Sequence, residues 1–337
     1  MTSKQNEILV DKFNRQVKNL RLSVIDRCNL RCRYCIVNET VNWIPTDNLL
    51  TFDEYIRLVK IFSSLGIHSI RITGGEPLVR PRICSLIGEI SKISGINHVS
   101  MTTNGVLLDK NIDLLNQAGL KSLNISLDTL NPDKFYKITR RDQFSTVISN
   151  IKQALEYPIK VKINCVALKN FNDNEFYDFV EFSIENDVTI RFIEFMPFNG
   201  NNWLEGSYIP SKEIKEIIEK KYTLITEPLE DPSQTSRNYK IEGNSGKIGF
   251  ISSVSESFCQ WCNRIRITAE GALRTCLHDS RESDLRHLLR AGSTDDQIKN
   301  LIKKSVFEKQ KGHVDWIDPS IIWNIPLDDR EMIKIGG

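Results

Sequence analysis

Three cysteines stand close together early in the chain, in the segment DRCNLRCRYC at positions 26–35. Their spacing is Cys-x3-Cys-x2-Cys. Three thiolates bound to a four-iron cubane leave one iron without a protein ligand, and that iron is free to bind a small molecule. A structural zinc ion is the alternative, but it takes four ligands, and neither a histidine nor a fourth cysteine is nearby. We therefore interpret Cys28, Cys32 and Cys35 as ligands of a 4Fe-4S cluster.

A second group of three cysteines, Cys259, Cys262 and Cys276, has Cys-x2-Cys-x13-Cys spacing. The spacing alone leaves two kinds of metal open. An iron–sulfur cluster would again have one unligated iron. A zinc ion would need a fourth ligand, and His278, two residues beyond Cys276, could supply it.

A hairpin is expected to bring this second group together. Glu270-Gly271 is a suitable turn between strands predicted at 264–268 and 272–276, and folding there returns Cys276 toward Cys262. Side chains alternate between the two faces of a strand, so Arg264 and Arg266 point the same way. Two guanidinium groups beside a metal site would form an anion clamp.

Short β-rich runs alternate with amphipathic segments over the first two thirds of the chain. The predicted strands are Leu20–Ile25, Ser69–Thr73, His98–Met101, Leu123–Ser126, Val161–Val166 and Thr189–Glu194. Helices are predicted near 52–65, 81–94, 109–119, 144–156, 174–186 and 211–222. This alternation predicts an α/β fold with a parallel sheet of right-handed βα units. Six strands are too few for a closed eight-stranded barrel, so we expect an open, partial (β/α)6 barrel.

The pattern changes around residues 225–240, a segment rich in Pro, Ser, Thr and Gln. We predict a barrel domain at 12–230 and a C-terminal domain at 231–337 that carries the second cysteine group. Further strands are expected at Lys247–Ser252, Arg264–Thr268 and Ala272–Cys276, with helices near 283–290 and 295–304. The charge run at 303–311 is interpreted as a solvated helix face. Cys84 and Cys165 stand alone and are interpreted as small buried hydrophobic residues.

Composition excludes several classes of protein. The chain has 337 residues, of which 40% are hydrophobic and 26% charged, as in ordinary globular proteins. Its net charge of +2 provides no general field for nucleic acid or an anionic membrane surface, so we expect neither as a partner. No stretch is long and apolar enough for a membrane helix, and the first residues lack the apolar core of a secretory signal. We expect a cytoplasmic protein with reduced cysteines.

The first cysteine group, with Tyr34 before its third cysteine, resembles the signature of the radical S-adenosylmethionine superfamily. This resemblance implies that the open iron binds S-adenosylmethionine and that its reductive cleavage yields a 5'-deoxyadenosyl radical. The segment ITGGEP at 72–77 is similar to the methionine-binding motif of the superfamily. The contacts with S-adenosylmethionine that the resemblance implies are Tyr34, Gly74, Gly75, Glu76, Ser126 and Met196.

The second cysteine group, followed by Asn263-Arg264-x-Arg266, resembles the GTP 3',8-cyclase family of this superfamily. The similarity runs from about Lys18 to the terminal Gly336-Gly337 and includes the segment GKIGFI at 246–251. It implies that a second 4Fe-4S cluster contacts the guanine of GTP and that the terminal glycines enter the active site. The implied GTP contacts are Arg21, Arg71, Thr102, Lys162, Arg264, Ile265 and Arg266. The implied catalytic residues are Arg264, Arg266, Gly336 and Gly337.

The activity that this resemblance implies is a lyase reaction, the cyclisation of GTP to 3',8-cyclo-7,8-dihydro-GTP at the start of molybdenum cofactor biosynthesis. The implied partners are a flavodoxin- or ferredoxin-like electron donor and the cyclic pyranopterin monophosphate synthase that receives the product; a homodimer is also considered. Two alternatives are kept. One is a radical enzyme that matures peptides, although such enzymes carry more C-terminal cysteines than this chain. The other is a non-catalytic zinc-binding adaptor.

Overall fold

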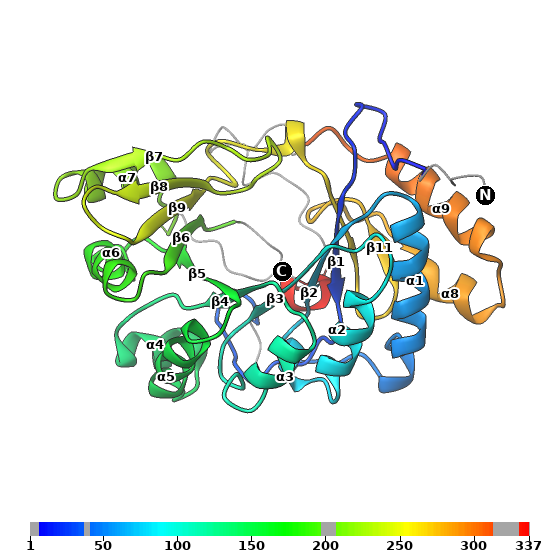
Figure 1. Ribbon diagram of the computed structural model, residues 1–337, viewed down its shortest axis with the longest axis horizontal. Helices are drawn as coiled ribbons and strands as arrows, with labels where there is room; N and C mark the ends of the chain where they lie inside the picture. The colour runs from blue at the N-terminus through cyan, green and yellow to red at the C-terminus, as the bar shows by residue number, and fades with distance from the viewer. Residues whose placement is uncertain (1–6, 37–40, 197–206, 313–329, 337) are drawn as a thin grey trace.

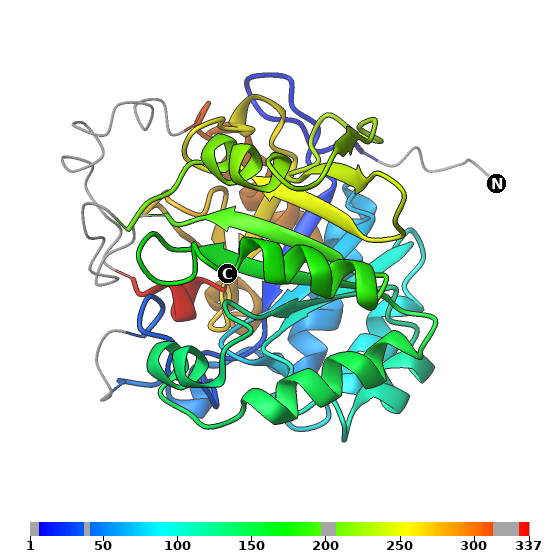
Figure 2. The ribbon, with the colours of Figure 1, turned by 90° about the vertical axis from the view of Figure 1, so that its left-hand side faces the viewer.

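The computed structural model describes residues 7–36, 41–196, 207–312 and 330–336. Its strands form one 12-stranded sheet in the order β12-β11-β10-β1-β2-β3-β4-β5-β6-β9-β8-β7. The sheet curves into an open arc with helices on its outer side, and the short helix α11 (Met332–Ile335) lies inside the arc near β2 (Figures 1 and 2). This arrangement confirms the predicted partial barrel. None of the described helices has the length and apolar character needed to cross a bilayer.

The six predicted barrel strands are all present and parallel, with ends that differ from the prediction by at most two residues. They are β1 (Asn19–Ser23), β2 (Ser69–Thr73), β3 (His98–Thr103), β4 (Ser122–Ser126), β5 (Lys160–Ala167) and β6 (Thr189–Glu194). The predicted helices are also present. They are α1 (Phe52–Ser64), α2 (Ile83–Ser91), α3 (Ile112–Gln117), α5 (Phe144–Leu155), α6 (Phe176–Glu185), α7 (Ser211–Glu219), α8 (Leu285–Arg290) and α9 (Asp295–Phe307).

One barrel helix escaped the sequence prediction. Helix α4 (Pro132–Thr139) follows β4, and the apolar residues that it buries are only Phe135 and Ile138, which makes a weak apolar stripe. Its start signal was nevertheless visible in the sequence. The side chain of Asn131 caps the helix by accepting from the amides of Asp133 and Lys134, and Pro132 occupies the first turn.

The C-terminal strands extend the barrel sheet at both of its edges. Strand β9 (Lys247–Ile251) pairs in parallel with β6, and β10 (Arg264–Ile267) pairs in parallel with β1. Antiparallel strands follow outside them: β8 (Arg237–Ile241) and β7 (Leu224–Thr226) next to β9, and β11 (Ala272–Arg274) and β12 (Ser283–Asp284) next to β10. An unpaired strand edge leaves backbone donors and acceptors unsatisfied, and this arrangement pairs both edges of the six-stranded unit. The predicted division at residue 230 falls between strands of one sheet and stays a prediction.

The two faces of the sheet have different chemistry. In β1 and β2, Leu20, Leu22, Ile70 and Ile72 are fully buried and belong to the main hydrophobic core. Side chains alternate along a strand, so the residues between them face the inside of the arc. Those residues include Arg21 and Arg71. The sheet therefore packs its apolar face against the helices and keeps a polar face for the interior.

Replacing Phe192 tests the core between β6, β9 and α6. Its buried ring lies 5.1 Å from that of Phe176 and 6.2 Å from that of Phe250 (centroid to centroid). Phe192→Ala should lower the free energy of unfolding by about 3–5 kcal/mol, because truncating a core aromatic leaves a cavity. Anaerobic urea unfolding measures the change. Phe307→Ala is the matched control, since Phe307 is 60% exposed; equal losses in the two variants would contradict this account of the core.

Candidate active site

The register of three neighbouring strands brings three arginines to one level of the barrel interior. Arg21 of β1 lies opposite Arg266 of β10 and opposite Arg71 of β2. Arg264 stands at the level of Asn19, nearer the start of β1. Ile265, between the two arginines of β10, is fully buried in the hydrophobic core. Its expected contact with substrate therefore cannot come from its side chain, because alternation along the strand turns that side chain outward.

The two cysteine groups lie at opposite ends of this arginine layer. Cys28 follows the carboxyl end of β1, whereas Cys262 precedes the amino end of the parallel strand β10. Cys276 follows β11, which runs antiparallel to β10 and so returns to the same end as Cys262. A five-residue strand spans roughly 15 Å, and this length separates the two ends.

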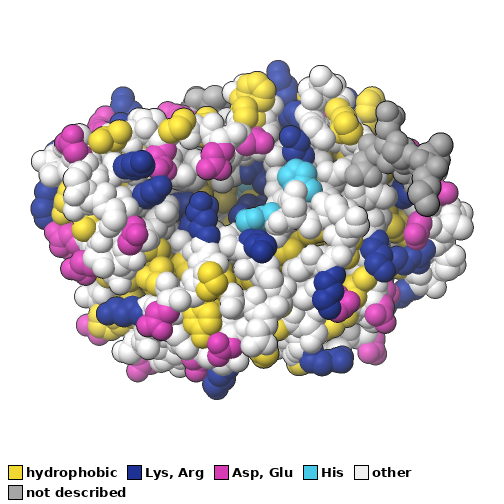
Figure 3. Space-filling view, viewed as in Figure 1, with side chains coloured by type: hydrophobic (Ala, Val, Ile, Leu, Met, Phe, Trp, Pro, Cys, Tyr) yellow, Lys and Arg dark blue, Asp and Glu magenta, His cyan; other side chains and the backbone are white. Residues whose placement is uncertain are grey.

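Both cysteine groups line a single cavity of about 340 Å³. Figure 3 shows a hollow near the centre of the molecular surface, with basic side chains at its rim. The predicted residues that line the cavity are Arg21, Cys28, Cys32, Tyr34, Cys35, Arg71, Gly74, Gly75, Thr102, Ser126, Met196, Cys259, Cys262, Arg264, Arg266 and Cys276. His278 lines it as well. The predicted residues outside this lining are Glu76, Lys162, Ile265 and Gly336, and Gly337 lies outside the described residues.

The thiols of the first group are poorly suited to carry negative charge on their own. Burial and then the nearby Glu76 carboxylate raise the pKa of Cys28 to about 11, despite opposing bonds from Leu30 and Asn104. Burial, followed by the charge of Cys28, raises the pKa of Cys35 to about 12. A positively charged group bound to the sulfurs would reverse this, because metal binding and deprotonation of a thiol are coupled. Three cysteine sulfurs that line one cavity are the donor set that an iron–sulfur cluster takes.

The Gly-Gly motif allows a close approach of two backbone segments beside this group. The amide of Gly75 donates to the carbonyl of Ile25 at 2.6 Å. A Cβ on Gly75 would overlap the carbonyl oxygens of Asp26 and Arg27. Only glycine fits there, and the approach fixes the motif against the loop that begins the cysteine segment.

Glu76 has a different place from the one expected for a ligand contact. Its buried carboxylate accepts from the hydroxyl of Thr103 and the amide of Asn104, each at 2.7 Å, and from the amide of Leu78 at 3.0 Å. Burial raises its pKa to about 7, although these three bonds lower it. The side chain of Asn104 in turn lies 3.6 Å from the sulfur of Cys28. Glu76 thus holds the loop that contacts a cysteine of the first group.

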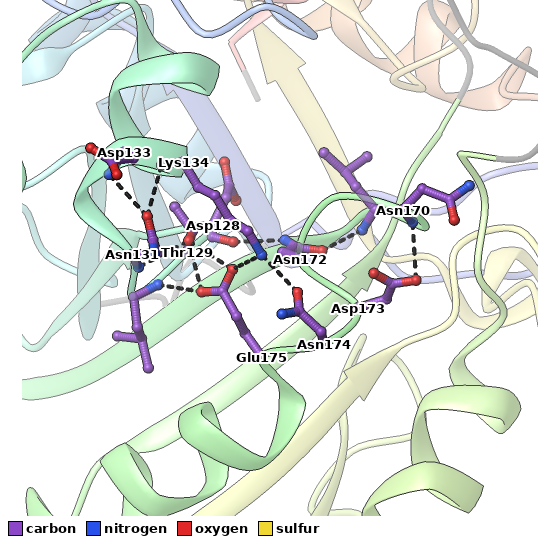
Figure 4. Close-up of polar contacts among 12 residues, drawn as sticks. Asp128, Thr129, Asn131, Asp133, Lys134, Asn170, Asn172, Asp173, Asn174 and Glu175 are labelled. Atoms are coloured by element: carbon purple, nitrogen blue, oxygen red, sulfur yellow. Dashed lines mark hydrogen bonds and ion pairs between the residues drawn. The ribbon is translucent and has the colours of Figure 1, made fainter.

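A polar network joins the loops after β4 and β5 (Figure 4), and its member Asp128 contacts Tyr34 of the first cysteine segment. Asp128 accepts from the Tyr34 hydroxyl at 2.7 Å, and burial raises its pKa to about 6 against the bonds that lower it. Asn172 donates to the carbonyl of Asp128 at 2.6 Å. Glu175 accepts from the hydroxyl of Thr129 and from the ammonium of Lys134, the latter at 2.7 Å. These bonds tie the loop after β4 to the loop after β5, so Tyr34 is held from two strand ends.

In the second cysteine group, basic side chains rather than carboxylates lie beside the thiol of Cys262. Burial alone would raise the pKa of Cys262, but the Lys309 ammonium and the Arg264 guanidinium, together with hydrogen bonds from Arg264, lower it to about 6. A thiolate is the form that binds iron. Among the described side chains, no group of three or more His, Cys, Asp and Glu is arranged to hold a single metal ion.

Sequence reasoning missed one interior cation, Arg191 of β6. It lies next to Asn164 of β5 in the register and lines the same cavity. Its guanidinium donates to the amide oxygen of Asn124, while its Nε is buried with no hydrogen-bond partner. The sequence nevertheless contained a signal, because Arg191 stands between two apolar residues of a predicted strand. Arg71 has the same pattern and also lies in the interior.

The interior cations lower one another's pKa values. Burial and then repulsion from the other cations lower the pKa of Arg71 to about 9 and that of Lys162 to about 8, and burial lowers that of Arg191 to about 10. The same causes lower the pKa of Arg21 and Arg266 well below the ordinary value. No carboxylate in the described parts of the chain forms an ion pair with any of these five groups. Buried positive charge without carboxylate partners favours the binding of an anion in this interior.

The C-terminal segment reaches into the same space. The carbonyl of Gly336 accepts from the guanidinium of Arg266 at 2.6 Å. Gly336 has a φ of +83°, and a Cβ there would lie 2.7 Å from the Cβ of Ser23 and 2.8 Å from the hydroxyl of Thr73. Glycine is therefore required both by the backbone conformation and by the space at the carboxyl ends of β1 and β2.

These features define the class of protein. A model of the radical SAM superfamily matches residues 22–183, and a model described as Molybdenum Cofactor Synthesis C matches residues 188–315. The fold resembles that of Streptococcus suis SuiB bound to S-adenosylmethionine, with a TM-score of 0.58 and 16% identity over 89% of this chain and 69% of that one. The chain is a radical S-adenosylmethionine enzyme, a class that uses S-adenosylmethionine and an iron–sulfur cluster.

Relatives define the family within this class. The chain is 43% identical to a GTP 3',8-cyclase of Clostridium perfringens, over 97% of this chain and 99% of that protein. It is 40% identical to the mitochondrial GTP 3',8-cyclase of Arabidopsis thaliana, over 98% of this chain and 84% of that protein. It is 47% identical to molybdenum cofactor biosynthesis protein 1 of Dictyostelium discoideum over 98% of this chain, but spans only 52% of that protein. The chain belongs to the GTP 3',8-cyclase family.

Substitution of Gly75 tests the close approach at the Gly-Gly motif. Gly75→Ala should lower the affinity for S-adenosylmethionine at least about tenfold, because the added Cβ pushes the motif away from the cysteine loop. Equilibrium dialysis of the anaerobically reconstituted protein measures this affinity. Gly88→Ala is the control, since Gly88 lies in helix α2 and a Cβ there would meet only Ala118, at 3.8 Å. Unchanged affinity in Gly75→Ala would show that the contact does not shape the site.

Proposed function

We propose that this chain converts GTP to 3',8-cyclo-7,8-dihydro-GTP in the first step of molybdenum cofactor biosynthesis. The observation that carries the proposal is the shared cavity: two cysteine groups at opposite ends and a layer of unpaired cations between them. A triphosphate is the ligand that such a layer fits, because guanidinium groups bind phosphate oxygens through paired hydrogen bonds.

The site residues divide into three sets in this proposal. Cys28, Cys32 and Cys35 hold the cluster that, with S-adenosylmethionine, supplies a 5'-deoxyadenosyl radical. Cys259, Cys262 and Cys276 hold a second 4Fe-4S cluster that receives the base of GTP. The cations bind the triphosphate, and this set is Arg21, Arg71, Lys162, Arg191, Arg264 and Arg266.

The chain's own contribution is to fix GTP in one geometry and to exclude water. Radical chemistry at the ribose and closure onto the base of the same molecule need both parts held in a near-attack arrangement. The barrel does this from two ends, while the interior cations bind the triphosphate. Gly336, bound to Arg266, closes the space beside β1 and β2, and Gly337 belongs to the same segment in this proposal.

Three further assignments belong to the proposal. A flavodoxin- or ferredoxin-like protein supplies the electron, and a cyclic pyranopterin monophosphate synthase takes the product. The protein acts in the cytoplasm, where its thiols stay reduced. Residues 12–230 form the catalytic barrel, and residues 231–337 carry the second cluster.

Product analysis tests the proposal directly. The anaerobically reconstituted protein, given GTP, S-adenosylmethionine and a reductant, should form 5'-deoxyadenosine and the cyclised nucleotide in equal amounts, with about eight irons per chain. A colourless protein with stoichiometric zinc would support the adaptor alternative. Cleavage of S-adenosylmethionine without any modification of GTP would favour a different substrate, such as a peptide.

The two cysteine groups should have separable roles. Cys28→Ala should abolish cleavage of S-adenosylmethionine, because it removes a ligand of the cluster that reduces it. Cys276→Ala should retain some uncoupled cleavage but lose GTP cyclisation. Chromatographic measurement of 5'-deoxyadenosine and cyclised product distinguishes the two losses. Cys84→Ala is the matched control, since Cys84 lies in helix α2, away from the cavity lining. Normal GTP conversion by Cys276→Ala would refute the substrate role of the second group.

Arg191 should contribute mainly to binding of GTP. Arg191→Ala should raise the KM for GTP at least about tenfold, because a hydrogen bond between charged groups contributes about 1.5–3 kcal/mol. Uncoupled cleavage of S-adenosylmethionine should be unchanged. Steady-state kinetics at varied GTP measures the effect. Arg57→Ala serves as the control, since Arg57 pairs with Asp295 outside the barrel. An unaltered KM in Arg191→Ala would remove this residue from the triphosphate site.

A further inference from the structure

Lys309 contradicts the expectation of a solvated charge run at 303–311. It follows helix α9 and is only 2% exposed, whereas Lys304 of the same helix is exposed. No carboxylate among the described residues forms an ion pair with Lys309. A buried ammonium group is costly unless its donors are satisfied, so the bonds that it makes point to its role.

The Lys309 ammonium joins the two strand ends that carry the second cysteine group. It donates to the carbonyl of Arg264 at 2.7 Å and to the carbonyl of Thr275 at 2.5 Å, and it lies 3.6 Å from the sulfur of Cys262. Thr275 directly precedes Cys276. An ammonium has three donors, and these three contacts use all of them. Lys309 therefore links the backbone two residues after Cys262 to the backbone just before Cys276, and it also contacts the sulfur of Cys262.

Arg15 holds the remaining cysteine in a similar way. Its guanidinium donates to the carbonyls of Cys259, Gln310 and Lys311, each at 2.6 Å. It is 8% exposed, and its Nε pairs with Asp11 at 2.6 Å. One arginine from the start of the chain thus connects Cys259 to the segment that follows Lys309.

The segment after Lys309 also packs directly on Cys259. A Cβ at Gly312 would lie 2.6 Å from the Cβ and 3.4 Å from the sulfur of Cys259. This contact leaves no room for Cys259 to shift toward residues 310–312. All three cysteines of the group are therefore fixed by two buried cations and one close approach.

We propose that Lys309 and Arg15 are positioning residues for the second iron–sulfur cluster: they set the separation of the three thiolates, and Lys309 stabilises the reduced cluster through its contact with Cys262. The inference rests on the proposed cluster at Cys259, Cys262 and Cys276. Outer-shell partners orient metal ligands, and hydrogen bonds and charge near the sulfurs set the reduction potential of a cluster.

A purely structural role for Lys309 makes a different prediction. If its two carbonyl bonds served only to join β10 and β11, its loss would lower the stability of the protein and leave the cluster's spectrum and potential unchanged. The reduction potential of the second cluster therefore separates the two roles.

The test uses the full chain in which Cys28, Cys32 and Cys35 are all replaced by alanine, so that only the second cluster contributes signals. Lys309→Met keeps the length of the side chain and removes its charge and donors. Lys304→Met is the matched control, an exposed lysine in the last turn of helix α9. After anaerobic reconstitution, iron content, the EPR spectrum of the reduced protein, the midpoint potential and the rate of iron loss to a chelator are measured.

Lys309→Met should lose iron at least about tenfold faster than Lys304→Met, its midpoint potential should be more negative, and its EPR spectrum should be shifted. Equal rates and equal potentials in the two variants would overturn the inference. If the parent chain with three alanines takes up no iron, the proposed second cluster itself fails, and that outcome is distinct from equal behaviour of the two variants.

A second variant covers the case in which Lys309→Met does not fold, as judged by circular dichroism. Arg15→Lys keeps a positive charge beside Asp11 but cannot reach three carbonyls with a planar fork. It should also lose iron faster than the parent chain. Iron loss at the parent rate would overturn the role assigned to the two cations.

Discussion

Unbalanced positive charge inside the barrel is the constraint on which the rest of this site depends. Arg21, Arg71 and Arg266 share one level of three adjacent strands, and their repulsion is not relieved by any carboxylate among the described residues. Such a layer is stable only because the surrounding sheet and helices bury a large apolar face on its other side. Burial of this apolar core therefore offsets the repulsion among the interior cations.

The parallel pairing of β10 with β1 and of β9 with β6 determines where these cations lie in the barrel. Because β10 lies beside β1 and runs the same way, its preceding cysteines and the cysteines that follow β1 occupy opposite ends of one space. The electrostatic surroundings of the two ends also differ. Carboxylates face the thiols of the first group, whereas Lys309 and Arg264 face Cys262. A molecule lying between the ends would meet two cysteine groups with different electrostatic surroundings.

Much of this could be predicted from the sequence, because local patterns determine it. Alternation of apolar residues located the strands, and cysteine spacing located both groups of cysteines that line the cavity. The pairing of β9 with β6 and of β10 with β1 could not be predicted, since it depends on contacts between distant parts of the chain. Arg191 and Lys309 were missed for the same reason: a lone basic residue shows its surroundings only when the neighbouring elements are in place. Glu76 belonged to a recognisable motif, but its three bonds to loop groups are visible only in the structure.

Strand β10 also completes the layer of interior cations. It adds Arg264 and Arg266 beside β1, whose Arg21 lies in register with Arg266 and with Arg71 of β2. Neither the early strands nor the later ones form this layer alone. Side chains alternate along a strand, so a shift of β10 by one residue against β1 would turn both of its arginines away from the interior.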